Sequence, residues 1–326
     1  MPCLRMPAWQ SRVVVRLNRH CWIHSKSLTG YIQTQKQPVF IKNYIPTIKL
    51  RLNLIRNYLN LIKLFCNYYF VKEGENMFGK NRRLNRLFVG NEKLCLLSPL
   101  DHGGWLGPVK GLDNPEWIVG EVVAGGANAV LASPGFLQAA QKSLKPETGL
   151  VLRVSLTAGL SKQGTQETPI ATLDSAIRMD ADAVVVSVFF GREGDIEIYQ
   201  WLAALVEECH PYGMPVIAEM MPPENVSYDP IAIAHAARIG MEIGADVIKT
   251  NFSGDVESFR SVVKSVPIPI IVAGGPKTGN EGDDATVKMA KAAIEAGAKG
   301  VAIGRRVWQS DNPREVTRQV ASAFWK

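Results

Sequence analysis

The sequence predicts a single (β/α)8 barrel, and three observations lead to this fold class. Short apolar runs alternate with segments of helical spacing eight times between Lys93 and the C-terminus. The apolar runs are nearly continuous, which is typical of parallel strands whose sheet is covered on both faces. Eight such units fit the roughly 250 residues of a typical barrel. A doubly wound open sheet is the alternative, but a GxGxxG sequence after its first strand is absent.

The expected strands are short and rich in Val, Ile, Leu and Ala. In chain order they are Leu94–Pro99, Ala129–Ala132, Val151–Leu156, Ala183–Phe189, Pro215–Met220, Val247–Thr250, Ile268–Ala273 and Gly300–Ile303. Helical spacing is clear in three of the segments between them, Ile196–Cys209, Ile231–Ile243 and Ala285–Ala296. Glycine follows each of these three segments shortly before the next strand, as is common at a helix C-terminus. A short helix over Arg82–Phe88 is expected beneath the barrel floor.

The first 76 residues differ in charge from the rest of the chain. They contain 12 of the 37 Lys and Arg residues but only two of the 30 acids, Glu73 and Glu75. Residues 77–326 therefore hold 25 basic and 28 acidic residues, a net charge of −3. The basic excess gives no reason to expect nucleic-acid binding by this larger part. No apolar run in residues 1–76 reaches the ~20 residues that a membrane helix needs.

Two interpretations of residues 1–76 remain open. One is an organelle transit peptide, which is basic and poor in acids. The other is translated upstream DNA, because the codons for Lys72–Met77 can contain a purine-rich ribosome-binding sequence just before an ATG. We hypothesise that Met77 is the native start, and a mature N-terminus well upstream of Met77 in the natively expressed protein would contradict this. In either case we expect 1–76 to be poorly ordered and assign the domain to 77–326.

Cysteine usage is typical of a reducing compartment. Only Cys95 and Cys209 lie in residues 77–326, far apart and without CxxC spacing. This argues against a disulfide framework and against a structural zinc site. We therefore expect a cytoplasmic protein that binds neither membranes nor nucleic acids.

Lys249 is the most informative single residue. It stands at the end of the apolar strand Val247–Thr250, at the C-terminal mouth where a barrel carries its functional residues. Lysine is almost never buried without a partner or a task. Partial desolvation favours the neutral amine, which can attack a carbonyl and form a Schiff base. On position alone, a solvated lysine just past the strand is an equal alternative.

Other strand ends also carry ionisable side chains. Asp101 and His102 follow the first strand, where either can stabilise an iminium or transfer protons, although Asp101 taken alone fits a turn cap better. Glu219 lies within the fifth strand, and a carboxylate in an apolar strand is costly unless it is paired. Lys249 on the next strand is its expected partner, and a purely structural pair would look the same. Arg153 on the third strand is a further buried charge, available to the substrate or to Glu219.

Glycines and basic residues follow the last two strands. Gly274, Gly275 and Lys277 come after the seventh strand, and Gly304 and Arg305 after the eighth. Glycines let backbone N–H groups approach an anion closely, and the phosphate site of a barrel usually lies after these two strands. Arg305 can add a charge-assisted contact. The pattern predicts a site for a small phosphorylated substrate.

The sequence predicts neither a metal ion nor a cofactor. Residues 77–326 contain three histidines, of which His210 precedes the fifth strand and His235 lies on a helix. No histidine triad can therefore assemble at the mouth. A GxSxG elbow and a Walker A loop are absent as well.

Four motifs occur together along the chain. They are Asp101-His102-Gly103, Ala245–Thr250, Ala273–Lys277 and Gly304-Arg305 with Trp308-Gln309-Ser310. With them the chain resembles the archaeal-type class I aldolase family (DeoC/LacD-like), which includes fructose-bisphosphate aldolases, 2-amino-3,7-dideoxy-D-threo-hept-6-ulosonate synthases and an autoinducer-2 phosphate thiolase. The resemblance covers essentially all of 77–326. It implies a homo-oligomer in which Lys249 forms the Schiff base, Asp101 is an acid/base residue, and the phosphate is held by Gly274, Gly275, Gly304 and Arg305.

The chain departs from the family pattern at two places. Fructose-bisphosphate and heptulosonate members carry a Tyr-Pro-Arg-Gly run after the fifth strand, in which the tyrosine transfers protons, whereas this chain has Met221-Pro222-Pro223-Glu224. Methionine cannot transfer a proton, so either Glu219, His102 or Asp101 replaces it or the reaction differs. Arg306 stands where relatives often have Asn.

The resulting hypothesis is a class I aldolase. Lys249 forms an iminium with dihydroxyacetone phosphate or a phosphorylated ketose, whose enamine adds to an aldehyde such as aspartate semialdehyde, or the reverse cleavage occurs. One alternative is a thiolase-like enzyme that transfers an acetyl group from a phosphorylated dione to coenzyme A. The other is a non-catalytic barrel that binds sugar phosphates.

Overall fold

The computed structural model describes residues 78–162, 164–275 and 283–325, and four short strands nearer the N-terminus. The chain divides into two units, Met1–Lys72 and Glu73–Lys326. In the first unit, strands β1 (Val13–Asn18), β2 (Cys21–Ser25), β3 (Tyr31–Gln33) and β4 (Pro38–Val39) pair in this order as an antiparallel sheet. The sequence analysis did not anticipate these strands.

Apart from these four strands, the other predictions for the N-terminal segment concern residues that lie outside those described. These are the poor order of residues 1–76 and the native start at Met77. Both stay predictions.

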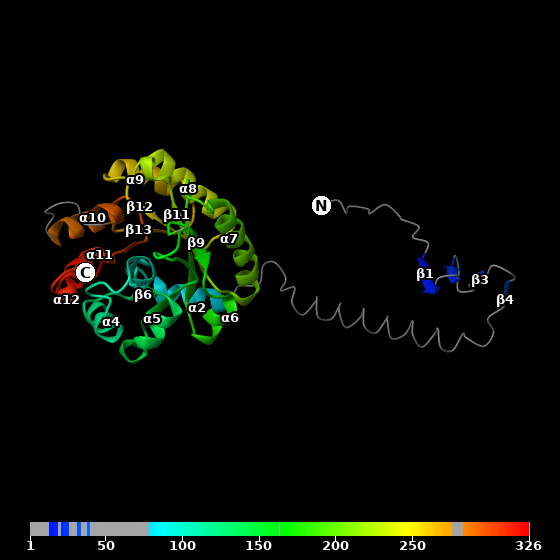
Figure 1. The fold of residues 1–326 in the computed structure, drawn as a ribbon. Coiled ribbons are helices and arrows are strands. Elements are labelled where there is room, and N and C mark those ends of the chain that lie inside the picture. The colour runs from blue at the N-terminus through cyan, green and yellow to red at the C-terminus, as the bar shows by residue number, and fades with distance from the viewer. Residues whose placement is uncertain are drawn as a thin grey trace. The chain divides into compact units, whose positions relative to one another are not determined.

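The second unit is built around a closed barrel of eight parallel strands (Figure 1). Each strand pairs with its sequence neighbour in the barrel, and the last strand pairs with the first. The strands are β5 (Cys95–Pro99), β6 (Ala129–Ala132), β7 (Gly149–Arg153), β10 (Ala183–Phe189), β11 (Val216–Met221), β12 (Val247–Asn251), β13 (Ile270–Ala273) and β14 (Gly300–Ala302). The predicted (β/α)8 barrel is thereby confirmed, with strand ends within two residues of the predicted ones except at the third strand.

Helices surround the barrel and follow the strands in alternation (Figure 1). They are α4 (Pro115–Ala124), α5 (Pro134–Ala139), α6 (Leu173–Arg178), α7 (Asp195–Cys209), α8 (Pro230–Glu242), α9 (Val256–Ser265), α10 (Asp283–Glu295) and α12 (Pro313–Ala321). Short helical turns lie at α3 (Gly103–Leu106), α11 (Arg305–Trp308), η1 (Gln141–Ser143), η2 (His210–Tyr212) and η3 (Glu224–Val226). In the part of the chain that is described, no helix is both long and apolar enough to cross a membrane.

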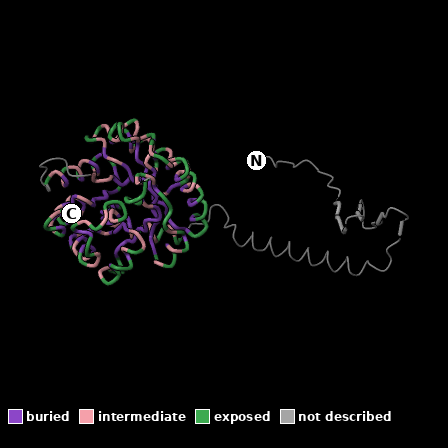
Figure 2. The backbone as a smooth tube through the Cα atoms, viewed as in Figure 1, coloured by how far each residue is buried: buried purple, intermediate pink, exposed green. Residues whose placement is uncertain are grey.

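Side-chain alternation along the strands produces two separate cores. On β12, Ile248 belongs to the outer core between the strands and the helices, whereas Val247 belongs to the core inside the barrel. Within the barrel unit, buried residues lie at the centre and exposed residues at the rim (Figure 2). Because the period of a strand is two, Lys249 points to the same side as Val247, into the barrel. At the C-terminal ends of the strands, charged residues therefore follow the apolar residues of the inner core.

The predicted floor helix is confirmed as α2 (Phe78–Leu87). Leu87 and Phe88 are buried in the inner core, so this segment closes the barrel from below. Lys80 Nζ lies 2.7 Å from Asp246 Oδ1, and Arg86 Nε lies 2.5 Å from Asp182 Oδ1. Both aspartates stand just before barrel strands, so these ion pairs fix the helix to the strand beginnings.

The third predicted strand, Val151–Leu156, is interrupted in the structure. Its barrel part ends at Arg153, and the chain continues into a hairpin of β8 (Ser155–Thr157) and β9 (Glu167–Pro169). The cause is Val154, whose N–H donates to Val185 on β10 while its carbonyl accepts from Ile170 and Ala171 after the hairpin. A continuous apolar run does not reveal this change of direction.

We expect Leu87→Ala to lower the free energy of unfolding by about 2–5 kcal/mol, because it leaves a cavity where the floor helix meets the inner core. Urea denaturation of the full chain measures the loss. Phe78→Ala on the same helix is the control, since Phe78 is 72% exposed and should change stability by less than about 0.5 kcal/mol. Equal losses in the two variants would contradict the role of Leu87.

Candidate active site

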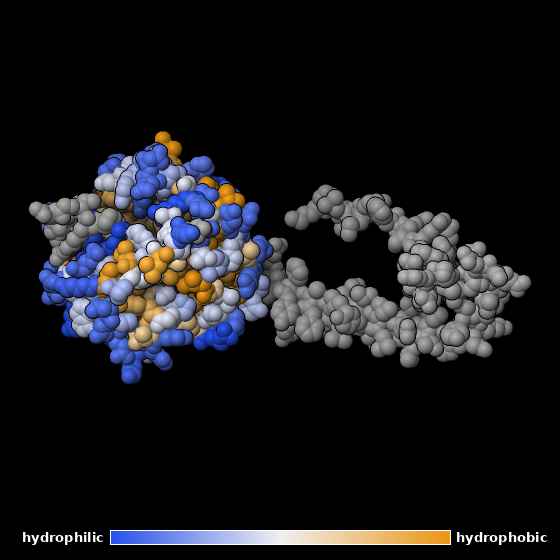
Figure 3. All heavy atoms as spheres, in the orientation of Figure 1, coloured by the Kyte–Doolittle hydropathy of each residue, from blue (hydrophilic) through white to orange (hydrophobic). Residues whose placement is uncertain are grey.

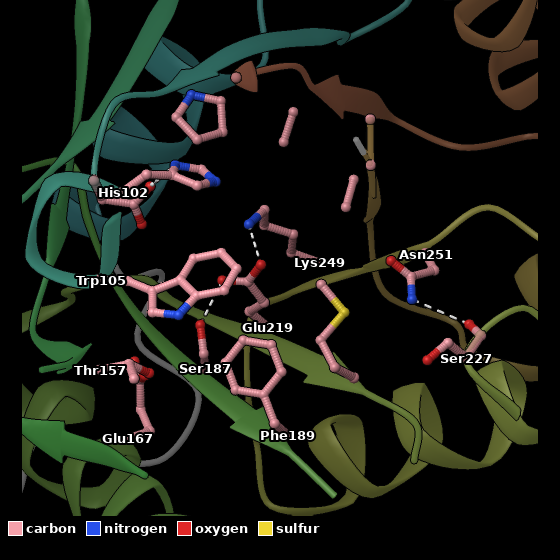
Figure 4. Close-up of a pocket in the computed structure, with 18 of the residues that line it drawn as sticks. His102, Trp105, Thr157, Glu167, Ser187, Phe189, Glu219, Ser227, Lys249 and Asn251 are labelled. Atoms are coloured by element: carbon pink, nitrogen blue, oxygen red, sulfur yellow. Dashed lines mark hydrogen bonds and ion pairs between the residues drawn. The ribbon is translucent and has the colours of Figure 1, made fainter. Parts of the chain in front are cut away.

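A cavity of about 410 Å³ opens at the C-terminal mouth of the barrel. It is lined by strand ends and by the loops that follow them, from β5 round to β14 (Figure 4). Its volume lies in the range of small-molecule sites. Hydrophobic residues gather near the middle of the molecular face seen in Figure 3, and hydrophilic residues surround them.

Three polar side chains stand in one row at the bottom of this cavity. Strand register pairs Ser187 on β10 with Glu219 on β11, and Glu219 with Lys249 on β12. Glu219 and Lys249 are each 5% exposed, and the Lys249 amine contacts Glu219 Oε1 directly. Figure 4 shows the amine directed at this carboxylate. The predicted pairing of Glu219 with Lys249 is therefore confirmed.

Arg153 connects this row to the first strand. From the end of β7, its guanidinium lies 2.7 Å from Glu219 Oε2 and 2.5 Å from Asp101 Oδ2, and it donates to Ser187 Oγ at 2.5 Å. Ser187 Oγ in turn donates to Glu219 Oε2 at 2.5 Å. Arg153 is 6% exposed and Asp101 7%. The sequence left the substrate or Glu219 open as the partner of Arg153. In the structure Arg153 binds Glu219, and it also binds Asp101, which was not expected.

The charges in this network determine which groups are ionised. Burial alone would raise the pKa of Glu219, but Lys249 and then Arg153 lower it to about 2. Burial also opposes ionisation of Asp101, yet Arg153 and to a lesser degree His102 hold its pKa well below the usual range. The same carboxylates raise the pKa of Arg153 against the effect of its burial. Asp101 and Glu219 are thus anions at neutral pH.

Glu167 is a site residue that the sequence analysis missed. It lies on the β8–β9 hairpin and lines the cavity, 9% exposed. Ser155 and Thr157 donate hydroxyl hydrogen bonds of 2.7 Å to its two oxygens, while Arg153 is 3.9 Å away. Burial raises the pKa of this carboxyl above its ordinary value. Only the hairpin brings Glu167 to the mouth, and no strand-end rule points to a residue so far along a loop.

His102 and Trp105 stand above the ion network on the segment after β5. His102 Nδ1 lies 3.2 Å from Asp101 Oδ1, and its ring makes an edge contact with Trp308 at a centroid distance of 5.6 Å. Trp105 on α3 lines the cavity with 45% of its surface exposed (Figure 4). The structure thus brings His102 to the side of Asp101, at the rim of the cavity.

The glycines after β13 and β14 line the opposite part of the cavity, together with Arg305. Gly275 has a left-handed backbone (φ 62°), and its N–H has no acceptor among the described residues. A Cβ on Gly304 would lie 2.7 Å from the Pro99 carbonyl oxygen, so only glycine fits there. The predicted cluster is therefore assembled. Lys277, the fifth predicted phosphate residue, lies outside the described residues.

Two details of this cluster differ from the simple expectation of amides that point at an anion. The Gly274 N–H donates to the Ala302 carbonyl at 2.9 Å, so it is not free to bind an anion. Gly274 can still let an anion come close to the backbone because it has no side chain. Arg306 is buried, and its Nε donates to the Gly274 carbonyl at 2.8 Å. Because the carbonyl and the following N–H of a peptide point in opposite directions, this bond turns the Gly275 N–H away from Arg306.

The position of the family tyrosine is apolar in this chain. Met221 ends β11 two residues after Glu219, so both point into the barrel, and Met221 lines the cavity. A tyrosine is present nearby at Tyr228, between η3 and α8, which also lines the cavity and is 55% exposed. A Cβ on Gly275 would lie 3.7 Å from the Tyr228 hydroxyl, which places Tyr228 beside the glycine cluster.

The sequence pattern of the "DeoC/LacD family aldolase" matches residues 95–310, which is most of the barrel. The chain belongs to this family. It is therefore a class I aldolase, and the family and fold expected from the four motifs are confirmed.

Two curated relatives and one solved structure illustrate the similarity. The chain is 34% identical over 246 residues to a 2-amino-3,7-dideoxy-D-threo-hept-6-ulosonate synthase of Halobacterium salinarum, covering 75% of this chain and 91% of the relative. It is 29% identical to a 2-amino-4,5-dihydroxy-6-oxo-7-(phosphonooxy)heptanoate synthase of Streptomyces griseus, covering 72% and 86%. An archaeal fructose-1,6-bisphosphate aldolase, whose catalytic lysine was solved bound to a carbinolamine intermediate, matches with a TM-score of 0.68 and 25% identity over 76% of this chain and all of that one.

We expect Glu219→Gln to lower stability at neutral pH and to flatten its dependence on acid. A carboxyl whose pKa falls from 4.5 to about 2 on folding contributes stability that is complete above about pH 5 and is lost as pH falls through 2. The contribution is on the order of 3 kcal/mol. Urea denaturation between pH 7 and pH 2 measures it, and parallel curves for the wild type and the variant would refute the shift.

Proposed function

We propose that the chain condenses dihydroxyacetone phosphate with an aldehyde through a Schiff base on Lys249. One observation carries this proposal: a lysine amine inside the barrel mouth, in contact with a carboxylate and open to a cavity with a glycine and arginine cluster on another wall. The amine is the only group at the mouth that can form an iminium, among the described residues. The aldolase family of the chain supports the same reaction.

Proton transfer at Lys249 runs through Glu219 in this proposal. For the amine to attack the ketone carbon, its ammonium form must lose a proton, and the Glu219 carboxylate is in contact to accept it. The attack forms the C–N bond and breaks the carbonyl π bond, and a proton passes from the attacking nitrogen to the former carbonyl oxygen, which gives a neutral carbinolamine. Glu219 returns the proton to the carbinolamine hydroxyl, which leaves as water and produces the iminium. Arg153 favours the ionised form of Glu219 before the first transfer and after the second, so Met221 need not transfer protons.

The iminium then loses a proton from the carbon that will form the new bond, and the enamine adds to the aldehyde. This second proton transfer needs a base near the reacting carbon and an acid for the aldehyde oxygen. Asp101 is ionised and adjoins His102, so we assign these two residues to it. In this assignment Glu219 transfers only the protons of amine attack and loss of water at the Lys249 nitrogen.

The names of the relatives indicate the type of acceptor. A 2-amino-4,5-dihydroxy-6-oxo-7-(phosphonooxy)heptanoate carries its ketone at C6 and a hydroxyl at C4. An aldol bond between C4 and C5 divides it into dihydroxyacetone phosphate and a four-carbon amino-acid aldehyde, aspartate semialdehyde. We propose an acceptor of this kind and a biosynthetic condensation, with the phosphate placed at Gly275, Gly304 and Arg305. The proposal includes a homo-oligomeric, cytoplasmic enzyme.

One observation keeps a second function under consideration. Met221 stands where fructose-bisphosphate members have their proton-transferring tyrosine, and a thiolase-like transfer of an acetyl group to coenzyme A does not use that residue. It would use the same lysine. Formation of acetyl-coenzyme A from a phosphorylated dione, in the absence of any aldehyde, would identify this reaction.

We expect borohydride to trap dihydroxyacetone phosphate on Lys249 of the full chain. Reduction of the iminium fixes the adduct, and peptide mass spectrometry locates it. Lys249→Met should abolish both the adduct and the activity, whereas Lys264→Met, on the exposed surface of α9, should change neither. An adduct elsewhere, or none on folded wild-type protein, would favour the non-catalytic barrel.

We also expect Arg305→Met to raise the KM for dihydroxyacetone phosphate by about tenfold to a hundredfold, because a charge-assisted hydrogen bond contributes about 1.5–3 kcal/mol. Initial rates at fixed aldehyde concentration measure this. The adduct on Lys249 should still form at saturating substrate. An unchanged KM would remove Arg305 from the phosphate site.

A further inference from the structure

Arg192 is a cation on the cavity wall that the proposed reaction leaves unused. It follows β10 in the loop that leads to α7, and it lines the cavity. Its guanidinium lies over the Phe189 ring, 4.3 Å from the ring centroid. Among the described residues, no carboxylate lies within ion-pair distance of it, so its hydrogen-bond donors remain available. Stacking on an aromatic ring holds a guanidinium in place while its edge stays free for an anion.

Barrel topology places Arg192 opposite the proposed phosphate site. The strands follow one another as β10, β11, β12, β13, β14, β5, β6 and β7 around the closed barrel. Arg192 follows β10 and Arg305 follows β14, four strands apart in a ring of eight. Lys249 on β12 stands midway, two strands from each. Along the ring of strands, Lys249 therefore lies between the two arginines.

The other charged residues described near Arg192 on this side of the cavity are acidic. Glu167 is nearby on the β8–β9 hairpin, whose Gln166 packs against the loop at Gly194, but Glu167 already accepts two hydroxyl hydrogen bonds and faces Arg153. Glu224 after β11 is exposed and carries the opposite charge. An anion entering this side finds one unpaired positive group among the described residues, that of Arg192.

From this placement we infer that Arg192 binds an anionic group at the far end of the acceptor aldehyde. The inference rests on the proposed function, because it takes the donor phosphate to lie at Arg305 and the new bond to form beside Lys249. The planar fork of a guanidinium fits a carboxylate or a phosphate with two parallel hydrogen bonds. The substrate class is therefore an aldehyde with a carboxylate or phosphate on the carbon chain beyond its carbonyl, and uncharged aldehydes are poor acceptors.

The test compares matched acceptors with the full chain and dihydroxyacetone phosphate. Butanal and 4-oxobutanoate have four carbons each and differ in one carboxylate, while glyceraldehyde and glyceraldehyde 3-phosphate differ in one phosphate. We expect the wild type to show a higher kcat/KM for the charged member of at least one pair. Arg192→Met should reduce that preference by about tenfold to a hundredfold, the value of one charge-assisted pair. It should leave kcat/KM for the uncharged member unchanged, and Arg192→Lys should restore part of the preference.

Two controls separate the ways in which this inference can fail. Arg178→Met removes an equal charge on α6, where Arg178 pairs with Asp174 in solvent, and should leave all four acceptors unaffected. Borohydride trapping with dihydroxyacetone phosphate alone should be the same in wild type and Arg192→Met. If trapping fails in the wild type, the proposed function falls and the inference with it. If trapping succeeds but the wild type does not discriminate, or Arg192→Met weakens charged and uncharged acceptors equally, the inference alone is refuted.

Discussion

The buried guanidinium of Arg153 is the interaction on which the chemistry of this barrel mouth depends. Glu219 and Lys249 lie on two other strands, Asp101 follows a third, and each of the three is almost inaccessible to water. Carboxylates at such depth are stable only when opposite charges and hydrogen bonds replace the lost water. Arg153 supplies these to Asp101 and Glu219 at once, and it leaves one oxygen of Glu219 for Lys249. A lysine or methionine at this position cannot form the same fork of contacts.

The same network shifts the pKa values of the carboxyl groups in different directions. Arg153 and Lys249 hold Glu219 and Asp101 as anions, so both can accept protons before any substrate arrives. Glu167, bound mainly by hydroxyl groups, has its pKa raised by burial and is the carboxyl of the three that is easiest to protonate. Sites that move protons commonly hold groups whose pKa values are displaced in opposite directions. The free site holds three carboxyl groups beside two cations, so its net charge is negative when all three carboxyl groups are ionised. This negative charge would stabilise a cationic iminium on Lys249.

Sequence reasoning succeeded where the fold follows from local pattern and failed where the chain changes direction. Lys249 was the expected partner of Glu219 because it lies on the neighbouring strand, and the two residues meet because neighbouring parallel strands are held in register. The hairpin that carries Glu167 was not predictable, since it depends on how Val154 divides its hydrogen bonds between two segments. The role of Arg306 was also hidden, because its bond to the Gly274 carbonyl joins two loops that are 32 positions apart. Arg192 was passed over because an arginine in a loop is usually solvated, and only barrel closure shows what it faces.

The division between strands and loops also explains how this site can keep its chemistry while its substrate changes. Ser187, Glu219, Lys249 and Arg153 belong to barrel strands, where register and packing fix each atom and a substitution disturbs the inner core. Arg192 and Glu167 belong to connections that the barrel does not need for closure. Replacing such a residue changes the charge that the mouth presents but leaves the Lys249 amine in place. The same reasoning makes Met221 the exception, because it is a strand residue whose apolar side chain offers no proton donor to the cavity wall. In the reaction we propose, the carboxylate two residues earlier transfers protons at the Lys249 nitrogen instead.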